Sequence, residues 1–88
     1  MKGKLKEALR KKLAKDILVF FYENPFSIDS VGGISAWVNG DRKEVQLALD
    51  ELVDLGVLER DSMGTTKGFS YTRDEKVMRI VKDLVVKG

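Results

Sequence analysis

Hydrophobic residues in the first quarter of the chain recur at steps of three and four, from Leu5 to Phe21. That spacing places them on one face of a helix, so the pattern predicts an amphipathic helix over about residues 5–23. The second half of this helix is apolar nearly all round, which indicates burial on more than one side. Asn24-Pro25 ends the helix, because proline lacks an amide donor and restricts the residue before it.

A short extended piece at residues 26–28 leads into a second predicted helix over about residues 30–38. The cap of this helix is either Asp29 or Ser30, because both side chains can accept from amide groups of the first turn. Two adjacent glycines weaken the helix by about 1 kcal/mol each relative to alanine, so it depends on tertiary packing. Trp37 lies on its apolar stripe and is expected in the core rather than on a stacking surface.

A turn at Asn39-Gly40 separates this helix from a third one, since both residues tolerate a positive φ angle. The third helix is predicted over about residues 42–55, behind an apolar stripe at helical spacing. Asp41 and Glu44 form a capping box at its start, in which each side chain can accept from the other residue's amide. Helix, turn and helix in this order are the helix-turn-helix pattern.

The period of the hydrophobic positions changes from helical to alternating after the third helix. The alternation predicts a β-hairpin over about residues 57–72, with a long polar tip between Asp61 and Lys67. A last helix follows over about residues 73–87, opened by a second capping box that starts at Thr72. The predicted fold is therefore mainly α with a small β-hairpin (α+β), in the order helix-strand-helix-helix-strand-strand-helix, and all 88 residues form one domain.

The third predicted helix and the strand after it also carry a family pattern. From Glu44 to Arg60 the chain reads E-V-Q-L-A-L-D-E-L-V-D-L-G-V-L-E-R. It resembles the V-x-x-A-L-x-x-L-x-x-x-G-[VL]-[VIL]-x-R run of winged helix-turn-helix domains in bacterial and archaeal transcription regulators. The resemblance covers about residues 26–72 and implies a winged helix-turn-helix that binds double-stranded DNA. Some domains of this family bind protein or RNA, so a protein-interaction module and an RNA or single-strand binder are the alternative functions.

In the docking mode that the resemblance implies, the third helix enters the major groove and the hairpin, called the wing, lies on the backbone or minor groove. Arg42 or Lys43 can read guanine, Gln46 can read adenine, and Leu47 can touch a thymine methyl group. The complete set of expected DNA-binding residues is Arg42, Lys43, Gln46, Leu47, Arg60, Thr65, Thr66, Lys67, Lys2 and Lys4.

Charge is distributed unevenly along the chain. The first 15 residues carry seven Lys or Arg against one acid, whereas the other 73 residues carry nine basic and thirteen acidic side chains. A basic arm on a mildly acidic body favours a polyanionic partner, although a solvated helix end has the same composition. Asp50, Glu51 and Asp54 on the third helix argue against tight DNA binding, because they would repel phosphate.

Residues that carry out catalysis are scarce. The chain contains no histidine and no cysteine, so the usual general base, thiolate and metal ligands are missing. We therefore expect no enzymatic activity, no metal, no cofactor and no small-molecule substrate. No apolar run approaches the roughly 18 residues of a membrane span, and the charged N-terminus is unlike a signal peptide, so a cytoplasmic location is expected.

The first and last helices carry more apolar surface than one small domain needs for its core. This surplus predicts a homodimer formed by symmetric packing of these two helices. The expected interface residues are Leu5, Leu9, Met78, Val81, Val85 and Val86.

Overall fold

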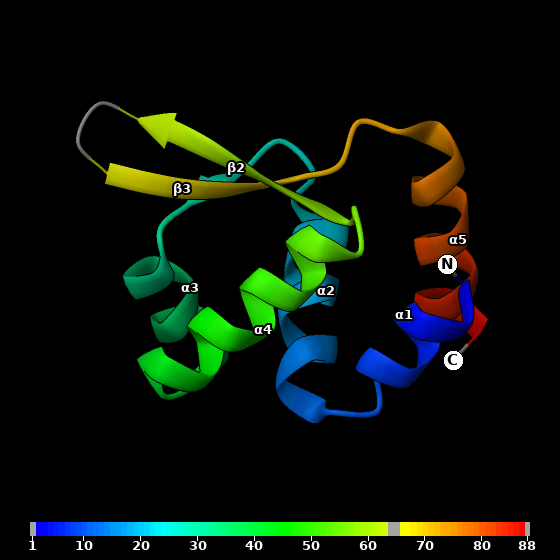
Figure 1. The fold of residues 1–88 in the computed structure, drawn as a ribbon, viewed down its shortest axis with the longest axis horizontal. Helices are drawn as coiled ribbons and strands as arrows, with labels where there is room; N and C mark the ends of the chain where they lie inside the picture. The colour runs from blue at the N-terminus through cyan, green and yellow to red at the C-terminus, as the bar shows by residue number, and fades with distance from the viewer. Residues whose placement is uncertain (1, 64–65, 88) are drawn as a thin grey trace.

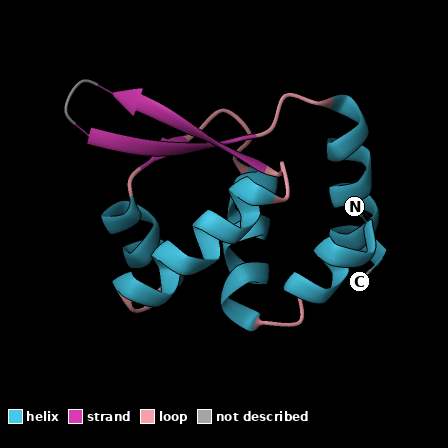
Figure 2. Cartoon of the chain, in the orientation of Figure 1, coloured by secondary structure: helices cyan, strands magenta, loops and turns pink. Residues whose placement is uncertain are grey.

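The structure is a computed structural model that describes residues 2–63 and 66–87. Within these residues the elements follow in the order α1 (Lys2–Ala8), α2 (Lys12–Glu23), β1 (Ile28–Asp29), α3 (Val31–Val38), α4 (Arg42–Asp54), β2 (Leu58–Met63), β3 (Thr66–Tyr71) and α5 (Glu75–Lys87). The strands form an antiparallel sheet in the order β1-β3-β2, which lies across one side of the helices (Figure 2). The predicted fold class, mainly α with a small sheet, is confirmed.

The core lies where α2 and α4 pack against each other below the sheet (Figure 1). Its buried apolar members are Leu5, Ile17, Leu18, Phe21, Ile34, Val45, Leu49, Leu52, Val57, Leu58, Phe69, Tyr71 and Val81. A fully buried Leu, Val or Phe contributes about 1.5–3 kcal/mol relative to an exposed one. Because α4 supplies three of these side chains, its inner face is fixed, and so is the direction of its outer face.

The N-terminal helix predicted over residues 5–23 is instead two helices. After Ala8 the last turn of α1 tightens, where the Lys11 amide donates to the Ala8 carbonyl at 3.3 Å, and Lys11 itself is extended (φ −79°, ψ 124°). The break lets α1 leave the line of α2 and run toward α5 (Figure 1), where Leu5 is fully buried. In one straight helix Leu5 would lie about 18 Å along the axis from Ile17, beyond the core.

Two helices begin at caps that the sequence predicts. Ser30 caps α3, because its Oγ accepts from the Gly33 amide at 3.2 Å. Asp41 caps α4, because its Oδ2 accepts from the amides of Lys43 and Glu44 at 3.1 and 3.2 Å. The start of α4 is therefore fixed at the residue after Asp41, which decides which side chains belong to its first turns.

The start of α5 differs from the prediction. Its cap is Asp74, whose Oδ1 accepts from the Lys76 amide at 2.9 Å, so the helix begins at Glu75 rather than at residue 73. Thr72 is not the helix cap; its Oγ1 accepts from the Asp74 amide at 3.1 Å and holds the turn before the helix. Among the described helices none is long and apolar enough to cross a membrane.

The hairpin is more regular than the sequence suggests. β2 and β3 pair without interruption from Leu58 opposite Tyr71 to Met63 opposite Thr66. Most of the stretch predicted as a polar tip is therefore strand. Alternating apolar residues mark a strand only where one face is buried, and the sequence of residues 61–67 in the outer half of the hairpin does not alternate in this way.

The prediction that Trp37 belongs to the core is wrong. Its side chain is 71% exposed, and its ring lies against that of Phe20 with centroids 5.4 Å apart. Ile34 and Ser35 form the buried side of α3 instead. Periodicity identifies the apolar face of a helix, but it does not tell how much of that face the neighbouring helices cover.

Candidate nucleic-acid interface

A shallow groove of about 760 Å³ lies between the starts of α3 and α4 and strand β3. We call it the basic groove; its lining residues are Ser30, Val31, Gly32, Arg42, Lys43, Gln46, Leu47 and Lys67. The structure thus brings together the four candidate residues predicted on the third helix with one from the hairpin. Of the described residues that line the groove, none is acidic.

The buried residues of α4 determine which of its side chains face outward. Val45, Leu49 and Leu52 are completely buried, so the positions across the helix face outward. Arg42 and Lys43 are exposed, and Leu47 is 70% exposed although it is a large apolar residue. An exposed leucine in a groove lined by cations is an apolar surface that a binding partner can cover.

The N-termini of two helices meet at the basic groove. The positive ends of helix dipoles favour anions such as phosphate. The first-turn amides of Gly33, Lys43 and Glu44 already donate to the helix caps, so the cationic side chains supply most of the attraction for an anion here. Gly32 lies beside the Arg42 guanidinium; a Cβ atom at this position would be 3.6 Å from Nη2. A larger side chain at residue 32 would therefore compete for the space in which Arg42 meets a ligand.

No acidic residue of α4 is among the described residues that line this groove, but Asp50 contacts one of them, Gln46. Glu44 and Glu51 line a different hollow, of about 430 Å³, which they share with Lys11 and Lys12 at the start of α2. Asp54 is exposed in the last turn of the helix, far along the axis from Arg42. Of the acids that argued against DNA binding, Glu51 and Asp54 therefore lie away from the groove, whereas Asp50 lies beside it.

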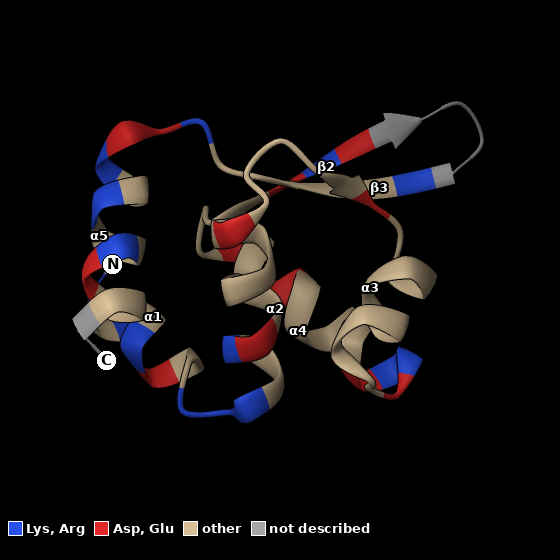
Figure 3. Ribbon diagram, turned by 180° about the vertical axis from the view of Figure 1, so that it is seen from behind, with Lys and Arg blue, Asp and Glu red and all other residues tan. Residues whose placement is uncertain are grey.

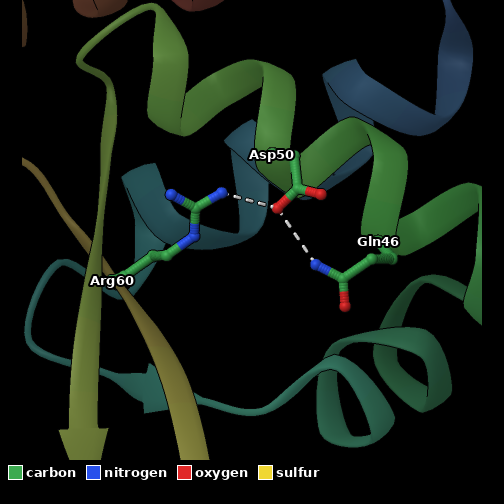
Figure 4. Close-up of polar contacts among 3 residues, drawn as sticks. All are labelled: Gln46, Asp50 and Arg60. Atoms are coloured by element: carbon green, nitrogen blue, oxygen red, sulfur yellow. Dashed lines mark hydrogen bonds and ion pairs between the residues drawn. The ribbon is translucent and has the colours of Figure 1, made fainter.

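Asp50 contacts two of the candidate residues (Figure 4). Its Oδ1 accepts from Gln46 Nε2 at 3.0 Å and from Arg60 Nη2 at 2.8 Å. The Asp50–Arg60 ion pair is about half exposed, so its contribution to stability is at most about 1 kcal/mol. The four-residue spacing could have revealed the first contact, but the second depends on where β2 lies beside α4 and has no local signal.

Comparison with known proteins identifies the fold. No protein-family model matches the chain, and no curated protein matches it in sequence. The solution structure of a homodimeric winged helix-turn-helix DNA-binding domain from Mycobacterium bovis, a possible ArsR-family transcriptional regulator, matches with a TM-score of 0.77 at 19% identity, covering 97% of this chain and 75% of that one. The fold is the winged helix-turn-helix. A possible transcriptional regulator from Methanosarcina mazei Go1 is also similar, with a TM-score of 0.75 at 16% identity over 97% of this chain and 76% of that one.

In winged helix-turn-helix terms, α3 and α4 are the helix-turn-helix, α4 has the position that is called the recognition helix, and β2–β3 is the wing. Lys67 is exposed on the wing strand β3. Thr66 begins the same strand, opposite Met63, whereas Thr65 lies outside the described residues. The wing therefore contributes Lys67 to the basic groove, and Arg60 of β2 reaches the recognition helix through Asp50.

The basic arm does not join the basic groove. Figure 3 shows two separate concentrations of Lys and Arg, one at the start of α4 and on β3, the other over α1, the start of α2 and α5. Lys2 lies 3.9 Å from Asp83 of α5, and Lys4 lines a hollow with Lys11. The two N-terminal lysines thus lie at the end of the molecule away from the wing (Figure 1).

The residues expected at a dimer interface divide into two groups. Leu5 and Val81 are completely buried within a single chain, so their assignment to an interface is corrected: they belong to the core. Leu9, Met78 and Val85 are partly buried, and Val86 is 64% exposed. The side chains of these four residues therefore keep solvent-exposed apolar surface.

Two observations bear on other chemistry. Among the described residues no group of three or more His, Cys, Asp or Glu is placed to hold a metal ion. Burial, with a smaller effect of the neighbouring Tyr22, raises the pKa of Tyr71 to about 12, so this phenol is uncharged at neutral pH. Tyr71 thus acts as part of the core.

Proposed function

We propose that this chain binds double-stranded DNA as a transcription regulator, with the recognition helix in the major groove and the wing on the backbone or minor groove. The observation that carries the proposal is the basic groove. Three cationic side chains and two helix N-termini converge there, with no acid among the described lining residues. A surface of this kind matches the phosphate backbone, which supplies most of the affinity in DNA binding.

The first turns of α4 supply the side chains for base contact. The major groove is about 12 Å wide and admits a helix. Arg42 and Lys43 can donate to guanine O6 and N7, and Gln46 can pair with adenine N6 and N7. Leu47 can cover a thymine methyl group, which explains its exposure in the free chain.

Wing and arm have different parts in this proposal. Lys67 stands at the edge of the basic groove and contacts phosphate close to the recognition helix. Arg60, Thr65 and Thr66 are further wing contacts to the backbone. The N-terminal lysines reach phosphates outside the stretch that α4 covers, because they lie at the opposite end of the molecule.

We further propose that the chain acts as a homodimer. The structurally similar domain from Mycobacterium bovis is homodimeric. The apolar surface that remains on α1 and α5, at Leu9, Met78, Val85 and Val86, is available for a symmetric helix contact.

A titration with labelled duplex at low salt tests DNA binding. The unaltered chain should bind duplex more tightly than single strands, and Arg42→Ala with Lys43→Ala should weaken duplex binding at least tenfold. Lys82→Ala is the control, because Lys82 is exposed on α5 at the far end of the molecule. Equal losses in the α4 double variant and in Lys82→Ala would contradict a specific role for the groove.

A protein-interaction module is the second candidate. Phe26 and Trp37 favour it, because they are 96% and 71% exposed and large apolar side chains are usually covered by something. Failure of the unaltered chain to bind any duplex at low salt would make this the leading function.

A further inference from the structure

Asp50 is an unexpected residue on the DNA-facing half of a recognition helix. It lies one turn after Gln46 on α4, and one of its carboxylate oxygens accepts from both Gln46 Nε2, at 3.0 Å, and Arg60 Nη2, at 2.8 Å. Figure 4 shows Arg60 reaching across from β2 to meet it. The carboxylate therefore ties the wing to the recognition helix.

The contact also determines which way the Gln46 amide points. An ionised carboxylate only accepts hydrogen bonds, so the amide nitrogen must face Asp50. The carbonyl oxygen of Gln46 then points away from Asp50, as Figure 4 shows, and the side chain lines the basic groove. This leaves one acceptor and one remaining N–H for a base edge, which is the pattern that adenine N6 and N7 require.

A carboxylate at this place weakens the nonspecific part of DNA binding. It offsets the charge of Arg60 and adds a negative charge beside the phosphates. A gain in selectivity offsets this loss, because an amide held in one orientation distinguishes a donor from an acceptor. An amide that is free to flip accepts either.

We infer that Asp50 is a positioning residue that sets the base selectivity of Gln46 and holds the wing beside the recognition helix. This inference rests on the proposed DNA-binding function. It predicts that removal of the charge at residue 50 strengthens binding to random duplex while it weakens discrimination at one base pair, the one that Gln46 reads.

The test compares Asp50→Asn with Asp54→Asn. Asparagine has nearly the same shape as aspartate, but it both donates and accepts, so it permits either orientation of the Gln46 amide. Asp54 is exposed on the same helix, and among the described residues neither Gln46 nor Arg60 donates to it. The two variants therefore change net charge equally, and only Asp50→Asn alters the contact to Gln46 and Arg60.

Affinities are measured for a site selected in vitro by the unaltered chain and for the same site with each base pair replaced in turn. Gln46→Ala first identifies the base pair that Gln46 reads. Asp50→Asn should then lower discrimination at that base pair by about five- to tenfold, and Gln46→Ala combined with Asp50→Asn should lower it no further than Gln46→Ala alone. Both asparagine variants should raise affinity for random duplex, and Asp50→Asn should raise it more, because Asp50 lies beside the groove and pairs with Arg60.

The outcomes separate the inference from the proposed function. Full discrimination by Asp50→Asn, or an equal loss in Asp54→Asn, would overturn the inference and leave DNA binding intact. Discrimination that does not depend on Gln46 at any base pair would overturn it as well. If the unaltered chain binds no duplex, the proposed function fails and the inference fails with it.

Discussion

Lys67→Ala isolates the electrostatic part of the proposed DNA contact. Arg42, Lys43 and Lys67 all line the basic groove, and within the described residues no ion pair involves any of them. Loss of one phosphate contact lowers the magnitude of the slope of log affinity against log salt concentration by about 0.9. The fall in affinity between 50 and 200 mM salt should therefore be about 3.5-fold smaller for the variant than for the unaltered chain.

The assay is a titration of labelled duplex at four or more salt concentrations, with a selected site and a random sequence. Lys67→Ala should weaken both duplexes by the same factor, because phosphate contacts carry no sequence information. Lys82→Ala on α5 removes the same charge at the far end of the molecule and should leave the slope nearly unchanged. Equal flattening by the two variants would refute the reasoning, because net charge and not the basic groove would then govern binding.

Three further predictions concern the fold and the assembly. Gly40→Ala should lower the free energy of unfolding, measured in urea, by about 1–3 kcal/mol, because the added methyl group would lie 2.9 Å from Leu13 Cδ1. Gly3→Ala should instead raise the free energy of unfolding by about 0.5–1 kcal/mol, because a methyl group there meets nothing within 4 Å. The free energy of unfolding should fall by about 2–3 kcal/mol as pH rises from 10 to 12, because the raised pKa keeps Tyr71 protonated in the folded chain while the unfolded chain ionises. Tyr71→Phe should abolish this loss when urea unfolding is measured at a series of pH values. Val86→Asp should shift sedimentation equilibrium toward the monomer mass, since Val86 is 64% exposed on α5, and an unchanged dimer would place the interface elsewhere.

The parts of the fold that the sequence predicted are those where local signals and packing agree. The recognition helix has a capping residue, an apolar stripe and a glycine with φ 80° just past its end, and its observed bounds differ from the predicted ones by one residue. The break between α1 and α2 has no comparable signal. It arises because Leu5 packs into the core beside α5, and such long-range contacts leave no mark in a local pattern.

The candidate site likewise contains residues that the sequence could place and residues that only the tertiary structure places. The outward face of α4 follows from its buried stripe, so Arg42 and Gln46 could be placed from the sequence. Lys67 joins them only through the register of β3, and Arg60 meets Asp50 only because β2 runs beside α4. From the sequence, Asp50 is expected to repel phosphate, because the charges along the helix do not show that Arg60 pairs with this carboxylate.

The modest charge of the basic groove gives dimerisation a definite role in the proposed function. One protomer offers three cationic side chains in the groove, and nonspecific binding that rests on them weakens as salt rises. Two linked protomers double the contacts, and the second one binds at a high effective concentration once the first is in place. Base discrimination doubles in free energy as well, because each half-site is read by its own recognition helix. A groove with few cations and a tethered Gln46 thus favours a protein that binds a paired site tightly and releases random DNA readily.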